Sequence, residues 1–233
     1  MSSPADILKG AIVRTCSRLG LSLSRSPRRQ LDLDLGWVGP IDVLIDVGVA
    51  QGTPELYLAA PDAFLLMIEP LEVFEPHIAK TLKRRPGEWL KFGVGSRAQL
   101  AEFVVCPDPR KSGRQPRSSS AVAENRVSVE IRTLDDLVGS HPRVLEARSI
   151  VLKIDCEGDE LEALLGADAL LGRVDVLIVE QGLLASKQAA SPSEVVALAS
   201  TKGLELFDVV AVGRVGGIAQ HADLVFVRDR LSS

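Results

Sequence analysis

A glycine-rich stretch near residue 50 combines a carboxylate with two glycines directly after an apolar run. It reads Ile45-Asp-Val-Gly-Val-Ala-Gln-Gly-Thr53. Gly48 and Gly52 let the backbone turn tightly and approach a ligand with no side chain in the way. Thr53 is expected to cap the helix that follows, and Pro54 suits the first position of that helix. The stretch therefore predicts a strand, a ligand-binding turn and a helix start, with Asp46 just before the turn.

A second carboxylate follows the next apolar run. The sequence there is Phe64-Leu-Leu-Met-Ile-Glu-Pro70, so Glu69 lies at the carboxyl end of a predicted strand. In nucleotide-binding βαβ units a carboxylate at this position accepts hydrogen bonds from ribose hydroxyls. The two stretches together predict a site for a cofactor that contains a nucleoside.

Two cofactors compete for this site. The NAD fingerprint is Gly-x-Gly-x-x-Gly, which places a pyrophosphate at the helix N-terminus, whereas this turn reads Gly48-Val-Ala-Gln-Gly52. Asp46 would repel a pyrophosphate, but it would attract the ammonium of a methionine moiety. The residues thus favour S-adenosylmethionine over NAD. An ordinary strand-to-helix turn of an α/β protein is the structural alternative.

A third cluster of carboxylates comes later in the chain. It reads Lys153-Ile-Asp-Cys-Glu-Gly-Asp-Glu160 and follows an apolar run. Ligands of open α/β sheets bind beyond the carboxyl ends of the strands, so Asp155 and Glu157 should face the same crevice as Asp46 and Glu69. Methyl transfer to a hydroxyl needs a base close to the acceptor oxygen, and neighbouring carboxylates can have their pKa raised toward that task. We therefore expect Asp155 and Glu157 to be catalytic.

Other side chains near the strand ends leave alternatives open. Glu180 ends a later strand and could bind acceptor hydroxyls or cap backbone amides. Oxygen ligands suit Mg²⁺, so Asp155, Glu157 and Glu180 form an alternative metal site, although no metal is expected. His221, which lies near Asp223, is an alternative general base.

Composition limits the class of protein. The chain has 233 residues, 46% of them hydrophobic and 25% charged, with a net charge of −4, which suits one globular domain without nucleic acid as a partner. No apolar run reaches the roughly 18 residues of a membrane span, and the N-terminus lacks a secretory signal. Cys16, Cys106 and Cys156 match no zinc or CxxC spacing. We expect reduced thiols in a cytoplasmic protein.

Apolar strands alternate with helices from residue 43 onward. The predicted strands are Val43–Val47, Ala63–Ile68, Trp89–Val94, Ile150–Asp155, Val174–Glu180, Glu205–Val212 and Ala222–Arg228. The predicted helices are Pro54–Ala60, Val73–Arg84, Asp159–Leu171 and Pro192–Lys202. Such apolar strands form a parallel sheet with helices on both faces. The last two strands have a short connection at Gly213–Gly217, so the final strand must be antiparallel.

The expected domain organisation follows from these elements. Residues 1–40 form an N-terminal helix, at Ala5–Leu19, and a linker, and residues 41–233 form the main domain. A rim insertion at about 96–133 contains two strand-like segments, Ala101–Val105 and Val127–Thr133. Between them, Pro107–Asn125 is rich in Pro, Ser, Gly and basic residues, which is typical of a surface loop or a lid over the site.

These motifs together resemble the FkbM family of S-adenosylmethionine-dependent methyltransferases, from about Ile41 to Val227. The motifs are Ile45–Gly52, Ile68-Glu-Pro70, Thr133-Leu-Asp135, Leu152–Glu160 and Leu164-Leu-Gly-Ala167. The resemblance implies a Rossmann-like class I methyltransferase fold with a seven-stranded, mostly parallel sheet. It also implies O-methylation of a hydroxyl on a sugar, polyketide or similar small metabolite.

The resemblance also assigns roles to residues. Asp46, Gly48 and Gly52 would hold the methionine part of the cofactor, Glu69 the ribose, and Asp155 and Glu157 would lie beside the transferred methyl. Thr53 belongs to the same turn, and Gly95-Ser96 is compatible with an adenine contact.

One departure concerns the cofactor turn. Family members commonly have Gly-Ala-Asn where this chain has Gly48-Val49-Ala50, so a potential hydrogen bond is lost and weaker or rearranged cofactor binding is expected. The alternative function is therefore a non-catalytic binding module with a methyltransferase fold. An NAD oxidoreductase is disfavoured by Asp46 and the antiparallel last strand. The acceptor and the oligomeric state stay open.

Overall fold

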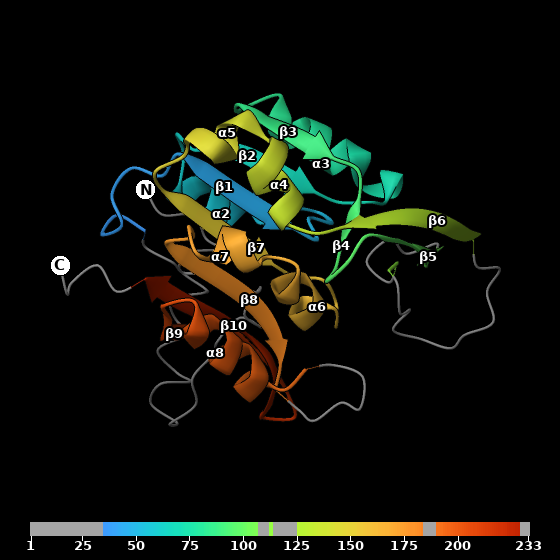
Figure 1. Ribbon diagram of the computed structural model, residues 1–233. Helices are drawn as coiled ribbons and strands as arrows, with labels where there is room; N and C mark the ends of the chain where they lie inside the picture. The colour runs from blue at the N-terminus through green and yellow to red at the C-terminus, as the bar shows by residue number, and fades with distance from the viewer. Residues whose placement is uncertain (1–34, 107–111, 114–124, 184–189, 229–233) are drawn as a thin grey trace, which may run out of the picture. The chain divides into compact units, whose positions relative to one another are not determined.

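The computed structural model describes residues 35–106, 112–113, 125–183 and 190–228 (Figure 1). The chain divides into one unit of residues 1–30 and a second of residues 31–233. All of the described residues belong to the second unit. The helix expected at Ala5–Leu19 and most of the expected loop at Pro107–Asn125 lie outside the described residues.

A seven-stranded sheet forms the centre of the fold. Its strands are β1 (Val43–Val47), β2 (Phe64–Ile68), β3 (Gly87–Leu90), β7 (Ile150–Ile154), β8 (Val176–Gly182), β9 (Leu204–Val215) and β10 (Ile218–Arg228). Their order is β3-β2-β1-β7-β8-β10-β9. Only β10 runs antiparallel to its neighbours, β8 and β9. The structure thus confirms the predicted mostly parallel sheet with an antiparallel last strand.

The third strand is shorter than predicted. The sequence indicated a strand over Trp89–Val94, but β3 ends at Leu90, which pairs with the last residue of β2, Ile68. Residues beyond Leu90 therefore have no partner in the main sheet. Gly93–Val94 instead forms β4, which pairs with β6 (Asn125–Arg132) in a second sheet of order β4-β6-β5. In this sheet β5 (Gln99–Val105) pairs antiparallel with β6, as the two strand-like segments predicted.

Helices cover both faces of the main sheet. One face is covered by α4 (Asp135–Ser140), α5 (Pro142–Glu146), α6 (Glu160–Leu165), α7 (Asp168–Leu171) and α8 (Pro192–Thr201). The other is covered by α2 (Pro54–Ala59), the 3₁₀-helix η1 (Glu72–Phe74) and α3 (Glu75–Leu82). Among the helices that the structure describes, none is long and apolar enough to cross a membrane.

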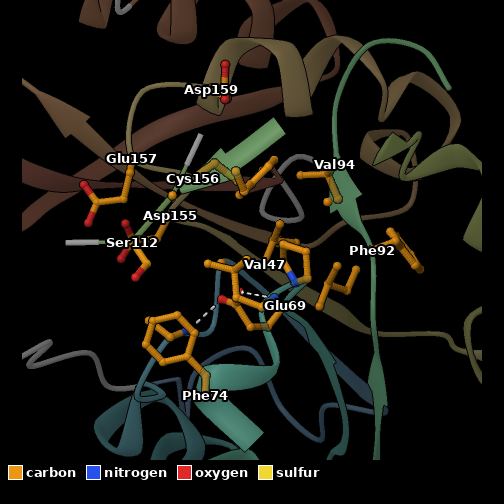
Figure 2. A pocket seen from close by; sticks show the side chains of 18 residues that line it. Val47, Glu69, Phe74, Phe92, Val94, Ser112, Asp155, Cys156, Glu157 and Asp159 are labelled. Carbon is orange, nitrogen blue, oxygen red and sulfur yellow. Dashed lines mark hydrogen bonds between the residues drawn. The ribbon is translucent and has the colours of Figure 1, made fainter. Parts of the chain in front are cut away.

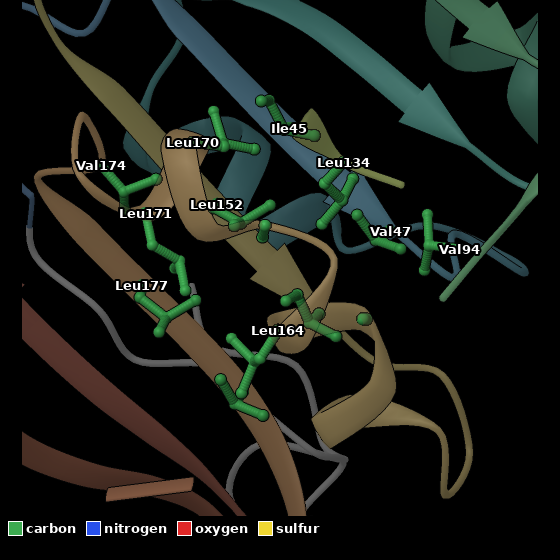
Figure 3. Close-up of a cluster of buried hydrophobic side chains, with 14 of the residues drawn as sticks. Ile45, Val47, Val94, Leu134, Leu152, Leu164, Leu170, Leu171, Val174 and Leu177 are labelled. Atoms are coloured by element: carbon green, nitrogen blue, oxygen red, sulfur yellow. The ribbon is translucent and has the colours of Figure 1, made fainter. Parts of the chain in front are cut away.

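The core of the first face shows how the helices are fixed. Figure 3 shows Leu134, Leu164 and Leu170 from the helical layer packed against Ile45 and Leu152 of the central strands. All of these side chains are at most 1% exposed. At roughly 1.5–3 kcal/mol for each fully buried aliphatic side chain, this layer contributes much of the hydrophobic stabilisation of the fold.

Two of the sequence motifs have structural roles in this helical layer. The Asp135 carboxylate accepts backbone N–H bonds from Ala169 at 3.0 Å and Leu170 at 2.9 Å, so it caps the start of α7. Gly166 separates α6 from α7, where a single helix was predicted, and a Cβ there would lie 2.1 Å from the Gly95 carbonyl oxygen. The break therefore lets this turn approach the end of β4, at the rim of the sheet.

Candidate active site

A cavity lies at the carboxyl ends of the central parallel strands (Figure 2). Its walls come from the turn after β1, the segment after β2, the region of β4 and the loop after β7. The residues that line it include Val47, Gly48, Ala50, Glu69, Leu71, Phe74, Phe92, Val94, Phe103, Ser112, Asp155, Cys156, Glu157 and Asp159. The location agrees with the general position of ligand sites in open α/β sheets.

Gly48 brings two walls of the cavity together. Its φ of +75° lies in the left-handed region, and a Cβ at this position would lie 1.9 Å from the backbone carbonyl oxygen of Asp155. The Gly48 N–H donates to the carbonyl oxygen of Ile68, with an N–O distance of 3.0 Å. The Asp155 N–H donates to the carbonyl oxygen of Val47, also at 3.0 Å. The turn after β1 is thus held between the ends of β2 and β7, at a distance that only glycine permits.

Glu69 lies in the cavity, as the strand-end position predicted. Its Oε2 accepts the Ala50 N–H at 3.0 Å, and its Oε1 accepts the Leu71 N–H at 2.9 Å. Burial raises the pKa of Glu69 to about 7, although the two N–H donors oppose the rise. Each ionised carboxylate oxygen has more than one lone-pair site. Glu69 can therefore accept further hydrogen bonds from a ligand.

Ala50 occupies a strained conformation in the same turn. Its φ is +45°, in the left-handed region, which costs an alanine roughly 1–2 kcal/mol and which Asn adopts more readily. The structure thus gives a backbone reason for Asn at this position, in addition to the lost side-chain hydrogen bond. The Ala50 N–H still reaches Glu69, so the backbone contact of the turn persists.

Asp46 does not reach the cavity. Its side chain is 0% exposed and faces away from the cavity-lining Val47, because successive strand residues point to opposite faces. Asp46 Oδ2 accepts a hydrogen bond from the Tyr57 hydroxyl, and its Oδ1 lies 3.9 Å from Lys153 Nζ. The predicted direct contact with a methionine ammonium therefore has no support in this geometry.

Gly52 and Thr53 lie with Asp46 and not in the cavity lining. Thr53 makes no side-chain hydrogen bond that caps α2, contrary to the sequence-based expectation, and its Oγ1 lies 3.5 Å from Asp46 Oδ2. A Cβ on Gly52 would lie 3.2 Å from the Tyr57 hydroxyl oxygen. The second half of the turn thus packs around Tyr57, which sequence reasoning had not singled out.

The loop after β7 brings both predicted catalytic carboxylates to the cavity. Asp155 and Glu157 line it, and Asp155 Oδ2 accepts a hydrogen bond from Lys153 Nζ at 3.1 Å. Glu157 has a φ of +54°, an unusual conformation for a non-glycine residue. The buried Glu160 carboxylate holds this loop by accepting the N–H groups of Cys156 at 3.1 Å and Gly158 at 2.9 Å.

Cys156 lies between the two carboxylates in sequence and also lines the cavity. Burial raises the pKa of its thiol, and the neighbouring Glu160, Asp155 and Asp159 raise it further. The thiol is therefore protonated at neutral pH. Because the thiolate is the nucleophilic form, Cys156 is not a candidate nucleophile.

A second, polar hollow adjoins the cavity at Asp159, which lines both. Its other lining residues are Gly95, Ser96, Arg97, Gln99, Glu102, Gly158, Leu161, Glu162 and Ala190. Ser96 donates a hydrogen bond from its hydroxyl to Glu162. The structure thus places Gly95 and Ser96, the predicted adenine contact, in this hollow and not in the cavity with Glu69.

The alternative site residues lie elsewhere in the fold. Glu180 and Asp223 are buried neighbours on β8 and β10 and line neither hollow. The His221 ring lies beside Gly213 of β9, also outside both hollows. Within the described part of the chain, no group of three His, Cys, Asp or Glu side chains is arranged to hold a metal ion.

Comparisons with known proteins identify the family. A family model described as the methyltransferase FkbM domain matches residues 46–207, more than half of the chain. The chain therefore belongs to the FkbM methyltransferase family, as its motifs predicted. A search of curated protein sequences found no match.

Several solved structures are similar in fold. The N-methyltransferase NodS from Bradyrhizobium japonicum WM9 is 14% identical, with a TM-score of 0.48 over 85% of this chain and 91% of that chain. The magnesium protoporphyrin IX methyltransferase from Synechocystis PCC 6803 with bound SAM is 10% identical, with a TM-score of 0.44 over 94% of this chain and 77% of that chain. The family assignment rests on the sequence match and not on these likenesses.

Replacing Gly48 with alanine tests the contact that joins the two walls. We expect Gly48→Ala to lower the free energy of unfolding by about 2–5 kcal/mol, since the new Cβ overlaps the Asp155 carbonyl and the left-handed φ is unfavourable for alanine. Gly182→Ala is the control, because no atom lies within 4 Å of its added Cβ. Denaturant unfolding measures both, and equal stability of the two variants would contradict the proposed contact.

Proposed function

We propose that this FkbM-family methyltransferase binds S-adenosylmethionine in the cavity and transfers the methyl group to a hydroxyl of a small metabolite or sugar moiety. The observation that carries the proposal is Glu69, a buried carboxylate in the cavity at the end of β2. Its two oxygens are fixed by the Ala50 and Leu71 N–H groups. This geometry suits a pair of ribose hydroxyls, and the family membership favours the adenosyl cofactor over NAD.

The rest of the cavity fits the remaining parts of this cofactor. Apolar walls at Leu71, Phe92 and Val94 would take the adenine face, and the Gly48 turn would take the methionine end beside Asp155. The cofactor would supply an activated methyl group on a sulfonium centre. Asp155 and Glu157 place negative charge beside the methionine end of the cavity. This charge would stabilise the cationic sulfonium there.

The acceptor would enter from the polar hollow. Arg97, Gln99 and Glu162 line it and offer both donors and acceptors of hydrogen bonds. Asp159 belongs to both hollows, so an acceptor bound in the polar hollow reaches the carboxylates of the β7 loop. Asp155 or Glu157 then takes the proton of the attacking hydroxyl. Most of the rate enhancement would come from alignment of the acceptor, with this base assisting.

A second candidate function is a binding module without turnover. It is favoured by one observation, the strained Ala50 in the cofactor turn, because strain there weakens the turn on which the cofactor depends. Such a module would bind the cofactor but transfer no methyl group.

Methyl transfer with labelled cofactor separates these functions. We expect label from [methyl-¹³C]-S-adenosylmethionine on the oxygen of a hydroxylated acceptor, found by mass spectrometry across a panel of sugars and polyketide alcohols. Asp155→Asn and Glu157→Gln should lower kcat, by about 10²–10⁴-fold for the residue that is the base, with little effect on cofactor affinity. Glu146→Gln, an exposed carboxylate on α5, is the control. Cofactor binding with no transfer to any acceptor would favour the binding module.

The pH dependence of cofactor binding tests the role of Glu69. The pKa of Glu69 is about 7 in the free protein because of burial, and the ionised form is the better acceptor for two ribose hydroxyls. Affinity for S-adenosylhomocysteine should therefore be constant above about pH 8 and fall as the pH drops below about 7, by up to tenfold per pH unit.

Glu69→Gln is the matched variant for this experiment. It should weaken binding by about 1–3 kcal/mol at pH 8 and flatten the pH dependence near pH 7, since the titrating carboxyl is gone. Calorimetric titration at several pH values measures both proteins. An unchanged pH profile in Glu69→Gln would overturn the assignment of Glu69 to the ribose.

A further inference from the structure

Lys153 is a buried lysine in the middle of the sheet. It lies on β7, pairs in register with Asp46 of β1, and is 4% exposed. Its Nζ lies 3.1 Å from Asp155 Oδ2 and 3.9 Å from Asp46 Oδ1. A buried ammonium is several kcal/mol unfavourable unless it is paired with opposite charge. Asp155 and Asp46 supply this opposite charge, so Lys153 is present for its charge and not for packing alone.

The charges around Lys153 keep it protonated. Burial lowers the pKa of Lys153, but Asp155, Asp46 and Asp223 raise it by more, so that the net shift is upward. Tyr57 of α2 donates a hydrogen bond from its hydroxyl to Asp46 Oδ2, the carboxylate oxygen that does not face Lys153. Asp46 is thus a carboxylate with no solvent contact, held between a phenol and the lysine.

Asp155 is the member of this group that faces the cavity. It lines the cavity and is partly exposed, whereas Asp46 and Lys153 are buried behind it. Lys153 and Asp46 pair in register on neighbouring strands and point to the same face of the sheet, whereas Asp155 follows the end of β7. A single ammonium therefore connects the Asp155 carboxylate in the cavity to the buried Asp46 carboxylate of β1.

We propose that Lys153 is a positioning residue for methyl transfer, whose ammonium fixes the Asp155 carboxylate at the cavity and whose buried counter-charge is Asp46. This inference rests on the proposed function and takes Asp155, of its two candidate carboxylates, as the base. The proton of the acceptor hydroxyl goes to Asp155, and Lys153 keeps its own. The proposal also gives Asp46 a role in turnover without any contact with the cofactor.

Other titratable groups also face Asp155, and all of them except Asp46 must be kept constant in any test. They are Asp46 on β1, Glu69 after β2, Glu160 on α6, Asp223 on β10 by way of Lys153, and Cys156, Glu157 and Asp159 on the same loop. Variants should therefore change Lys153 and its counter-ion only.

The test compares Lys153→Met with the double variant Asp46→Asn/Lys153→Met. The single variant removes the ammonium but leaves Asp46 buried without its counter-charge, which endangers folding. The double variant removes both charges and keeps similar side-chain volumes, so it is the variant on which the proposal is judged. Lys202→Met, which breaks a surface ion pair with Asp168, is the control for loss of a lysine.

Two readouts separate positioning from stability. Without the ammonium, the Asp155 side chain loses the hydrogen bond that Lys153 donates to it, so in a crystal structure of the folded double variant its carboxylate should leave the wild-type position. In the same variant kcat should fall at least tenfold at neutral pH, while S-adenosylhomocysteine affinity stays within about threefold.

The outcomes are distinguishable. An Asp155 carboxylate in its wild-type position, with kcat equal to that of the wild type and Lys202→Met, would overturn the positioning role. If the wild type transfers no methyl group, the proposed function fails, and the crystal structure of the double variant still decides whether Lys153 fixes Asp155. A carboxylate that does not move there overturns the inference by itself.

Discussion

The contact between the turn after β1 and the loop after β7 is the constraint on which the candidate site depends. Because residue 48 has no side chain, its backbone lies directly against the carbonyl of Asp155. The hydrogen bond from the Asp155 N–H to Val47 fixes the same contact. Two neighbouring parallel strands therefore end in segments that share one cavity, and Glu69 from the end of β2 forms a third wall.

The site has an exposed part and a buried part, on opposite faces of the central strands. Val47 faces the cavity, whereas Asp46 faces a buried polar group formed with Tyr57 and Lys153. The buried group adds little stability on its own, since the desolvation of a lysine and an aspartate offsets most of their attraction. Its connection to Asp155 gives it a use, because it fixes a carboxylate at the cavity from behind.

The sequence predicted the sheet well because its signals are local. Continuous apolar strands, and a short connection before β10, are enough to specify a parallel sheet with an antiparallel last strand. The end of β3 was not predictable, because it depends on where the partner strand β2 ends. The strand-end rule predicted Glu69 in the cavity, where the structure has it. The sequence did not reveal that Asp46 is enclosed by Tyr57 and Lys153, because that contact depends on how α2 packs on the sheet. Lys153 is a charge inside an apolar run, but one of its two partners, Asp46, is distant in the sequence and meets it only because β1 pairs with β7.

A crystal structure with S-adenosylhomocysteine would show whether the cavity at Glu69 holds the cofactor. We expect both ribose hydroxyls within hydrogen-bond distance of Glu69, the ligand sulfur beside the contact of Gly48 with Asp155, and Asp46 still enclosed by Tyr57 and Lys153. Ligand bound in the polar hollow at Ser96, or elsewhere without contact to Glu69, would contradict this expectation.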